Sequence, residues 1–266
     1  MGSKAKIAKD ICPIIQKFID YTSADTYIEP FVGGANVIDK IRCMHKVGSD
    51  VNLYLIELLK HAQNHLDFPE TVTYDQYCAA RTVFNQDKDN CIYDTEYEYW
   101  YIGAVGFLAS FNGRFFDGGF AKEYDSGGQH RIPYQEHLRN LLSQDLSEID
   151  FAWMGYEHYV ADDYYKDCVF YCDPPYVNTK KYNSKFNFDS NEFFHSARKL
   201  SQNNIVIISE QSAPDDFVCI WEQKVKRQIN TQDKFDQVER LFIHESLFDR
   251  YDIDAIIGSS PERKLF

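Results

Sequence analysis

Apolar and polar positions alternate between helix-like and strand-like segments along most of the chain. Helical spacing of apolar residues predicts helices over residues 5–19, 51–65 and 188–200, and a further helix is predicted over 35–43. Short apolar runs predict strands over residues 26–31, 44–48, 149–154, 168–172 and 204–210. Residues 219–227 and 238–244 resemble a closing antiparallel pair. This alternation favours an α/β fold with a mostly parallel sheet.

The middle of the chain follows a different pattern. Residues 74–85 and 97–110 are predicted to be helical, and an irregular stretch that contains five glycines covers residues 111–133. Irregular stretches of this length within a domain are usually functional or disordered. We therefore expect residues 1–70 and 146–266 to form one domain, with residues 71–145 as a mostly helical insert.

Charge and cysteine content narrow the function class. The net charge of −13 argues against non-specific nucleic-acid binding, which needs Lys and Arg at phosphates. Basic residues nevertheless cluster near positions 4–9, 180–185 and 224–227. The sequence is therefore compatible with a basic face on an otherwise acidic protein. The seven cysteines form no C-x-x-C pair, which predicts reduced thiols in a cytoplasmic protein without zinc. Neither a signal peptide nor an apolar run of the ~20 residues that span a bilayer is evident.

Two motifs near the N-terminus suit a nucleotide-like cofactor. The strand at residues 27–31 runs into Gly33 and Gly34, and glycines allow close backbone approach to a ligand. Asp50 follows the next strand, where a carboxylate can accept hydrogen bonds from a ribose diol. Each motif has a plainer interpretation, because many strand-to-helix turns contain two glycines and Asp50 could simply cap a helix beginning at Val51.

The motif that decides the interpretation is Asp173-Pro174-Pro175-Tyr176, directly after a buried strand. The two prolines remove backbone donors and restrict the chain, which leaves the Pro174 carbonyl as a fixed acceptor. Asp173 adds a second acceptor and Tyr176 a ring for stacking. Two acceptors can bind both protons of an aryl amine and localise the nitrogen lone pair, and the ring can stack on an extruded base. No metal is required for this chemistry.

From residue 2 to about residue 244, the chain resembles the DNA adenine-N6 methyltransferases that place the cofactor motif first, the target-recognition region next and the catalytic motif last. Bacterial and phage DNA adenine methylases belong to this group. The resemblance implies a Rossmann-like sheet that binds S-adenosylmethionine, a helical recognition insert and methylation of the N6 amino group of adenine in double-stranded DNA.

The resemblance also assigns roles to residues. It places Lys4 near the methionine moiety, Asp50 at the ribose and Tyr156 near the cofactor adenine, and it makes residues 173–176 catalytic, with Asp173 also at the cofactor. The cofactor motif covers Glu29, Pro30, Phe31, Gly33 and Gly34, with Ala35 where the family has its last glycine. The tryptophan that usually starts the N-terminal motif is absent.

Candidate DNA contacts lie in two regions. Residues 110–116 resemble the family's Asn-x-x-Gly-x-Phe region, and the candidates there and in the following loop are Asn112, Arg114, Lys122 and Arg131. Arg131 could read a guanine edge, and Lys180 and Lys181 could contact phosphate. Two alternatives stay open: a catalytically silent regulatory protein that binds S-adenosylmethionine or DNA, and an RNA adenine methyltransferase. A restriction endonuclease partner is also left open.

Overall fold

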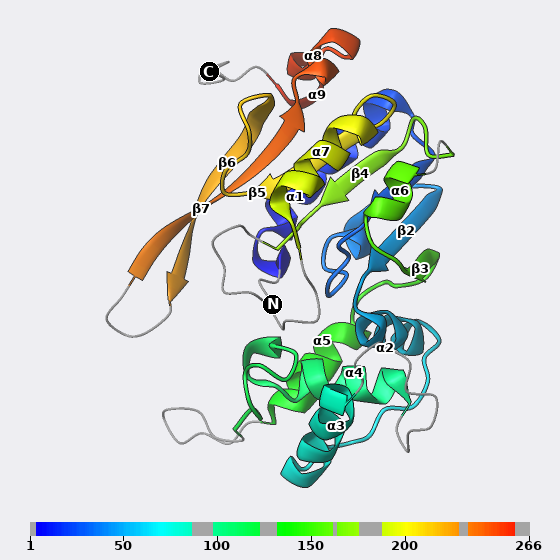
Figure 1. Cartoon of the computed structure of the whole chain (residues 1–266), viewed down its shortest axis with the longest axis vertical. Coiled ribbons are helices and arrows are strands. Elements are labelled where there is room, and N and C mark those ends of the chain that lie inside the picture. Colours follow the sequence, from blue (N-terminus) through cyan, green and yellow to red (C-terminus); the bar gives the residue numbers. More distant parts are fainter. Residues whose placement is uncertain are drawn as a thin grey trace.

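A computed structural model of the chain describes residues 4–86, 98–122, 132–161, 164–175, 188–228 and 234–258. Seven strands form one sheet in the order β3-β2-β1-β4-β5-β7-β6 (Figure 1). The first five strands are mutually parallel, as expected from the sequence: β1 (Thr26–Glu29), β2 (His45–Asp50), β3 (Ile149–Trp153), β4 (Val169–Cys172) and β5 (Ile205–Glu210). The predicted α/β fold is confirmed.

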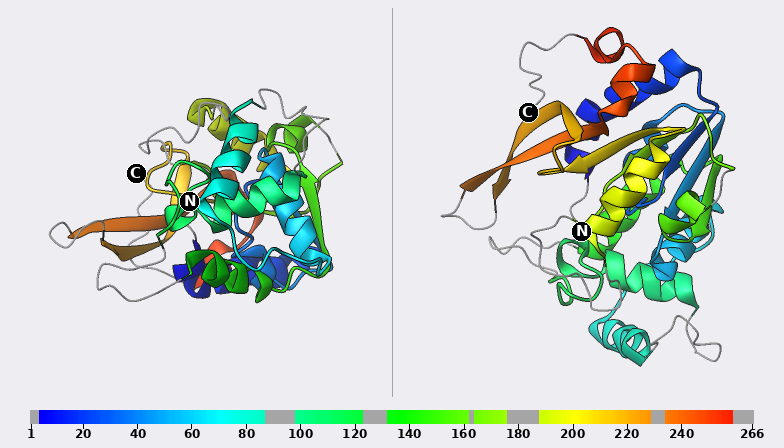
Figure 2. Two further views of the ribbon diagram at one scale, coloured as in Figure 1. Left: turned by 90° about the horizontal axis from the view of Figure 1, so that it is seen from below. Right: turned by 45° about the horizontal axis from the view of Figure 1, so that its top comes forward.

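The antiparallel pair at the end of the chain is also confirmed. β6 (Phe217–Gln228) and β7 (Lys234–His244) pair with each other, and β7 inserts beside β5. The two strands form a ribbon that projects from the body of the molecule in both views of Figure 2. Insertion of β7 places residues from near the end of the chain against the parallel strands.

Helices cover both faces of the sheet, as strand alternation requires for a parallel sheet. Val169 and Tyr171 of β4 belong to the core that contains α1, whereas Phe170 and Cys172 belong to the core that contains α6 and α7. The helices of these layers are α1 (Ala8–Thr22), α6 (Glu157–Ala161), α7 (Ser190–Leu200), α8 (Ser246–Arg250) and α9 (Ile253–Ile257). In the described part of the chain, no helix is long and apolar enough to span a membrane.

The helix predicted over residues 35–43 is wrong. One 3-10 turn, η2 (Ile38–Lys40), occupies that stretch, between the turn after β1 and the start of β2. Gly33 and Ala35 have φ angles of 50° and 55°, in the left-handed region. Left-handed residues cannot form part of a right-handed helix, so the chain passes through turns here instead.

The middle of the chain forms a helical group beside α2 (Leu53–Gln63), which follows β2 directly (Figure 1). Its helices are α3 (Tyr74–Gln86), α4 (Tyr99–Leu108) and α5 (Pro133–Leu142), with η3 (Phe111–Gly113) between the last two. A Cβ added at Gly103 of α4 would lie 2.1 Å from the carbonyl oxygen of Tyr54, so the α2–α4 approach requires glycine. The insert boundaries at residues 71 and 145 remain a prediction.

Candidate active site at the carboxyl edge of the sheet

Four carboxylates end four adjacent parallel strands. Glu29 closes β1, Asp50 closes β2, Asp173 follows β4 and Glu210 closes β5. Because β2, β1, β4 and β5 are neighbours in that order, these side chains line one edge of the sheet. Open α/β sheets bind ligands at this carboxyl edge.

The turn after β1 is tied to the end of β2 through Asp50. The Gly33 N–H donates to Asp50 Oδ2 at 3.3 Å, and the Asn52 N–H donates to Asp50 Oδ1 at 2.9 Å. Burial raises the pKa of Asp50 to about 6, although these N–H donors act in the opposite direction. Asn52 caps α2, since its side chain accepts from the Leu55 N–H at 3.3 Å. The alternative role of Asp50 as the helix cap is therefore wrong.

Two aromatic residues expected at the cofactor do meet. Phe31, in the turn after β1, stacks on Tyr156, which follows β3, with ring centroids 5.5 Å apart and an interplanar angle of 27°. Phe188 and Phe193 pack edge-on against Phe31, at 5.9 and 5.6 Å. The result is a cluster of apolar rings directly beside the glycine turn.

The catalytic-motif aspartate is ion-paired inside the protein. Lys4 Nζ in η1 (Lys4–Lys6) lies 3.2 Å from Asp173 Oδ1 and 2.9 Å from Glu239 Oε2 of β7. Burial raises the pKa of Asp173 to about 6; Lys4 lowers it and Glu239 raises it. Lys4 is buried, so it does not contribute to the basic surface that the sequence left open.

Two more buried carboxylates complete this cluster. Glu29 accepts a 2.6 Å hydrogen bond from the Tyr27 hydroxyl, and burial raises its pKa well above the usual range. Burial likewise raises the pKa of Glu210 to about 7, and Asp173 and Glu239 act in the same direction. Glu210 and Glu239 are not among the site residues predicted from the sequence. Glu239 lies two positions before the buried Leu241 on the same strand face, which is a signal of an inward charge.

One known protein family matches the chain over most of its length. The model for the D12 class N6 adenine-specific DNA methyltransferases matches residues 1–214, most of the chain. The chain belongs to this family. The prediction of an adenine-specific DNA methyltransferase is thereby confirmed, and the predicted catalytic motif and both predicted cofactor motifs lie inside the matched region.

Curated relatives of the methyltransferase are distant. It is 24% identical over 256 residues to a type II methyltransferase of Methanocaldococcus jannaschii, with 81% of this chain and 83% of the relative covered. It is 23% identical to a DNA adenine methylase of Haemophilus influenzae, covering 90% and 80%. A DNA N-6-adenine-methyltransferase of Escherichia phage P1 is 25% identical over 65% of this chain, which spans only 24% of that relative's length.

The last residues of the catalytic motif reach the limit of the described chain. Pro174 is buried and Pro175 is exposed, directly after Asp173. Tyr176, Lys180, Lys181 and Arg131 lie outside the described residues, so their predicted roles stay predictions.

The remaining candidate DNA contacts lie in the helical group of the methyltransferase. Asn112, Arg114 and Lys122 are exposed on the segment between α4 and α5. Asn112 and Gly113 adopt φ angles of 54° and 62°, and a Cβ added at Gly118 would lie 2.3 Å from the Phe111 carbonyl oxygen. The segment is thus a compact turn, and the Phe111 ring on it is 57% exposed.

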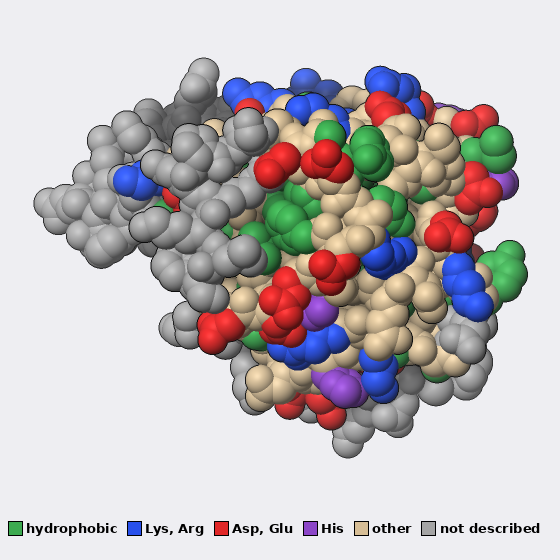
Figure 3. All heavy atoms as spheres, turned by 90° about the horizontal axis from the view of Figure 1, so that it is seen from above, with side chains coloured by type: hydrophobic (Ala, Val, Ile, Leu, Met, Phe, Trp, Pro, Cys, Tyr) green, Lys and Arg blue, Asp and Glu red, His purple; other side chains and the backbone are tan. Residues whose placement is uncertain are grey.

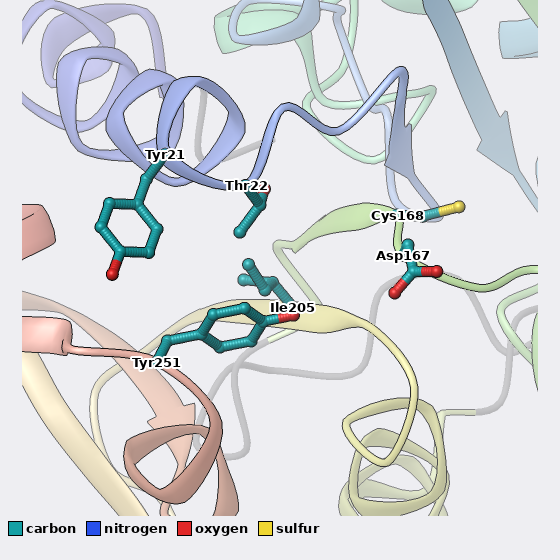
Figure 4. A pocket seen from close by; sticks show the side chains of 6 residues that line it. All are labelled: Tyr21, Thr22, Asp167, Cys168, Ile205 and Tyr251. Carbon is teal, nitrogen blue, oxygen red and sulfur yellow. The ribbon is translucent and has the colours of Figure 1, made fainter.

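The opposite edge of the sheet carries a hollow at the N-terminal ends of β4 and β5, lined by Tyr21, Thr22, Asp167, Cys168, Ile205 and Tyr251 (Figure 4). Viewed from the α8–α9 side, acidic and basic side chains of the described residues are interspersed (Figure 3). Ligands of open α/β sheets bind at the other edge, so we assign no catalytic role here.

Proposed function

We propose that this chain transfers a methyl group from S-adenosylmethionine to the N6 amino group of adenine in double-stranded DNA. One observation supports this most directly. Asp173, with Pro174 and Pro175 after it, lies at the carboxyl end of β4, beside the strand whose turn carries Gly33. An acceptor for an amino group and a cofactor turn are thus on adjacent strands.

The residues at this edge fit S-adenosylmethionine. Phe31 and Tyr156 provide an apolar ring surface for the adenine, and Asp50 provides a carboxylate for the ribose hydroxyls. Lys4, Glu29 and Pro30 complete the set that the family resemblance assigns to the cofactor. Gly33 and Gly34 keep the turn between these groups free of side chains. The cofactor supplies a methyl group on a positively charged sulfur, which leaves as a neutral thioether.

The protein's part in the reaction is to hold the amine. Asp173 and the Pro174 carbonyl accept hydrogen bonds from the two amino protons, which localises the lone pair on N6. That lone pair would attack the methyl group that bound S-adenosylmethionine supplies, and the proton that N6 loses would pass to ionised Asp173 and from there to solvent. Asp173 acts as an acceptor in its ionised form, and Tyr176 stacks on the flipped base.

The substrate binds, in this proposal, across the helical group and the catalytic edge. Asn112, Arg114 and Lys122 contact one part of the duplex, and Arg131, Lys180 and Lys181 contact another. The proposed location is the cytoplasm of a bacterial or phage-infected cell, where DNA is accessible.

The test is methyl transfer from labelled S-adenosylmethionine to unmethylated duplex DNA, followed by nucleoside analysis. Labelled N6-methyladenine in DNA is the expected product. Transfer only to RNA of the same sequence would replace the proposed substrate. Cofactor binding without transfer to either nucleic acid would identify a silent regulatory protein.

A further inference from the structure

We propose that Glu239 is a positioning residue of the active site: it holds the Lys4 ammonium group so that Asp173 can exchange that ammonium for the target amino group. The inference rests on the proposed role of Asp173. Glu239 lies on β7, beyond the region of the chain that the family model matches.

The geometry makes Lys4 a bridge between two carboxylates. Lys4 Nζ is closer to Glu239 Oε2, at 2.9 Å, than to Asp173 Oδ1, at 3.2 Å. The Lys4 and Glu239 side chains are 8% and 7% exposed, whereas Asp173 is 21% exposed. Asp173 is therefore the more accessible end of the bridge, and the Lys4–Glu239 pair is its buried end.

The basic residue next to Glu239 on β7 does not compete with Lys4 for its carboxylate. Arg240, the next residue, points to the other strand face, where its guanidinium donates to the Gln211 carbonyl at 2.6 Å and to Glu222 at 3.1 Å. The nearby basic side chain of β7 is thus engaged elsewhere, and the ammonium group that reaches Glu239 comes from η1, 235 residues away in sequence.

A second partner lowers the cost of releasing Asp173. A buried ammonium group without a carboxylate is costly, so a lysine held by Asp173 alone would resist exchange. With Glu239 in place, Lys4 keeps one charged partner when the amino group binds to Asp173. Replacing Glu239 by an uncharged residue should strengthen the hold of Lys4 on Asp173 and slow the step that needs Asp173.

The same replacement changes the charge balance around Asp173. The groups that face it are Lys4 of η1, Glu29 of β1, Glu210 of β5 and Glu239 of β7. Glu239 raises the pKa of Asp173 and Lys4 lowers it. Removing the Glu239 charge therefore lowers the pKa of Asp173. Since ionised Asp173 is the active form, the acid limb of kcat moves to lower pH.

The test is Glu239→Gln, assayed for kcat, KM for duplex DNA, cofactor affinity and pH profile. We expect kcat at pH 8 to fall roughly ten-fold, with KM and cofactor affinity changed by less than about two-fold, and the acid limb to shift downward. Glu222→Gln is the matched control, because Glu222 lies in the adjacent strand and is exposed. It should leave all four quantities unchanged. A fall in kcat with an unshifted acid limb would show a merely structural role and overturn the inference.

A second measurement separates this inference from the proposed function. The carboxyl group of Asp173, labelled with ¹³C, is titrated by NMR in the wild type and in Glu239→Gln, which requires no catalysis. A lower pKa in the variant supports the bridge even if the wild type methylates no DNA; an unchanged or higher pKa overturns it. Should Glu239→Gln fail to fold, Glu239→Asp keeps the charge at a greater distance from Lys4. It should lower both kcat and the pKa of Asp173 below their wild-type values, and wild-type values for both would contradict the bridge.

Discussion

Asp50 and Asp173 end two strands that are separated only by β1, and they are held in contrasting ways. Burial raises the pKa of each to about 6. Backbone N–H groups of Gly33 and Asn52 hold Asp50, whereas the ammonium group of the Lys4 side chain holds Asp173. A carboxylate fixed by backbone suits a permanent binding role, and one held by an exchangeable side chain suits a group that changes partners.

This contrast divides the active site into two halves. The half at β1 and β2 combines a glycine turn, stacked rings and a backbone-bound carboxylate. The half at β4, β5 and β7 places three carboxylates around one ammonium group. We therefore expect damage to the first half to weaken cofactor binding and damage to the second to slow the transfer step.

The largest expected effect belongs to Asp173→Asn. The amide has the same shape but no charge, so it loses the acceptor strength needed at the amino group. We expect kcat to fall by about 10²–10³-fold, the usual cost of removing one such stabilising contact. Single-turnover methyl transfer measures the step, and equilibrium binding should show cofactor affinity within a few-fold of the wild type.

Asp150→Asn is the control for that variant, because Asp150 lies exposed on β3 of the same sheet. It should be fully active. Loss of cofactor binding by a folded Asp173→Asn protein would remove the proposed division between the two halves.

Asp50 and Asp173 could be found in the sequence because each directly follows an apolar run that forms a parallel strand. Parallel strands end at the same edge, so the residues after them meet. Glu239 could not be found this way. Its contact with Lys4 spans 235 residues and depends on where β7 inserts beside β5, which no local pattern specifies.

Backbone conformation explains why the helix predicted over residues 35–43 does not form. The apolar spacing of residues 35–43 suits a helix, but Ala35 adopts a left-handed φ of 55°, at the position where the family has glycine. Its methyl group is fully buried. Burial of the turn against the core thus overrides local helix preference, which spacing alone does not reveal.

After Asp173→Asn, the next largest effect is expected for Asp50→Ala, and it should appear in cofactor binding. It removes the acceptor of two backbone N–H groups and the proposed ribose partner. We expect cofactor affinity to fall by about ten-fold or more, with kcat at saturating cofactor largely retained. Isothermal calorimetry and steady-state kinetics measure the two quantities. A fall in kcat as large as that of Asp173→Asn, with unchanged affinity, would contradict the division.

The carboxylate cluster also predicts a dependence of stability on pH. Burial raises the pKa of Glu210 from 4.5 to about 7, so the folded state binds a proton that the unfolded state releases. This contribution is complete below the unfolded value and is lost as pH rises through about 7. Asp173 and Glu239 face Glu210 and raise its pKa further, whereas Lys4 lowers it.

Glu210→Gln tests this contribution. The free energy of unfolding, measured with urea, should fall between pH 5 and pH 8 in the wild type. In the variant, the decrease in the free energy of unfolding should be smaller by on the order of 1–3 kcal/mol. The decrease that remains is due to Asp50 and Asp173. Glu222→Gln, at an exposed site, should retain the wild-type slope. An identical slope in Glu210→Gln would show that Glu210 is ionised like an ordinary glutamate.

The smallest expected effect lies outside both halves, at the exposed turn of the helical group. If Arg114 contacts one phosphate, Arg114→Ala should weaken DNA binding a few-fold and reduce the slope of log affinity against log salt by about 1. Neither cofactor affinity nor single-turnover kcat at saturating DNA should change, since Arg114 is proposed to contact only the DNA backbone. Lys17→Ala, on the exposed side of α1, is the matched control and should keep the full salt slope. An equal change in both variants would mean that DNA senses the overall charge of the protein rather than this turn, and the recognition surface would have to be sought elsewhere.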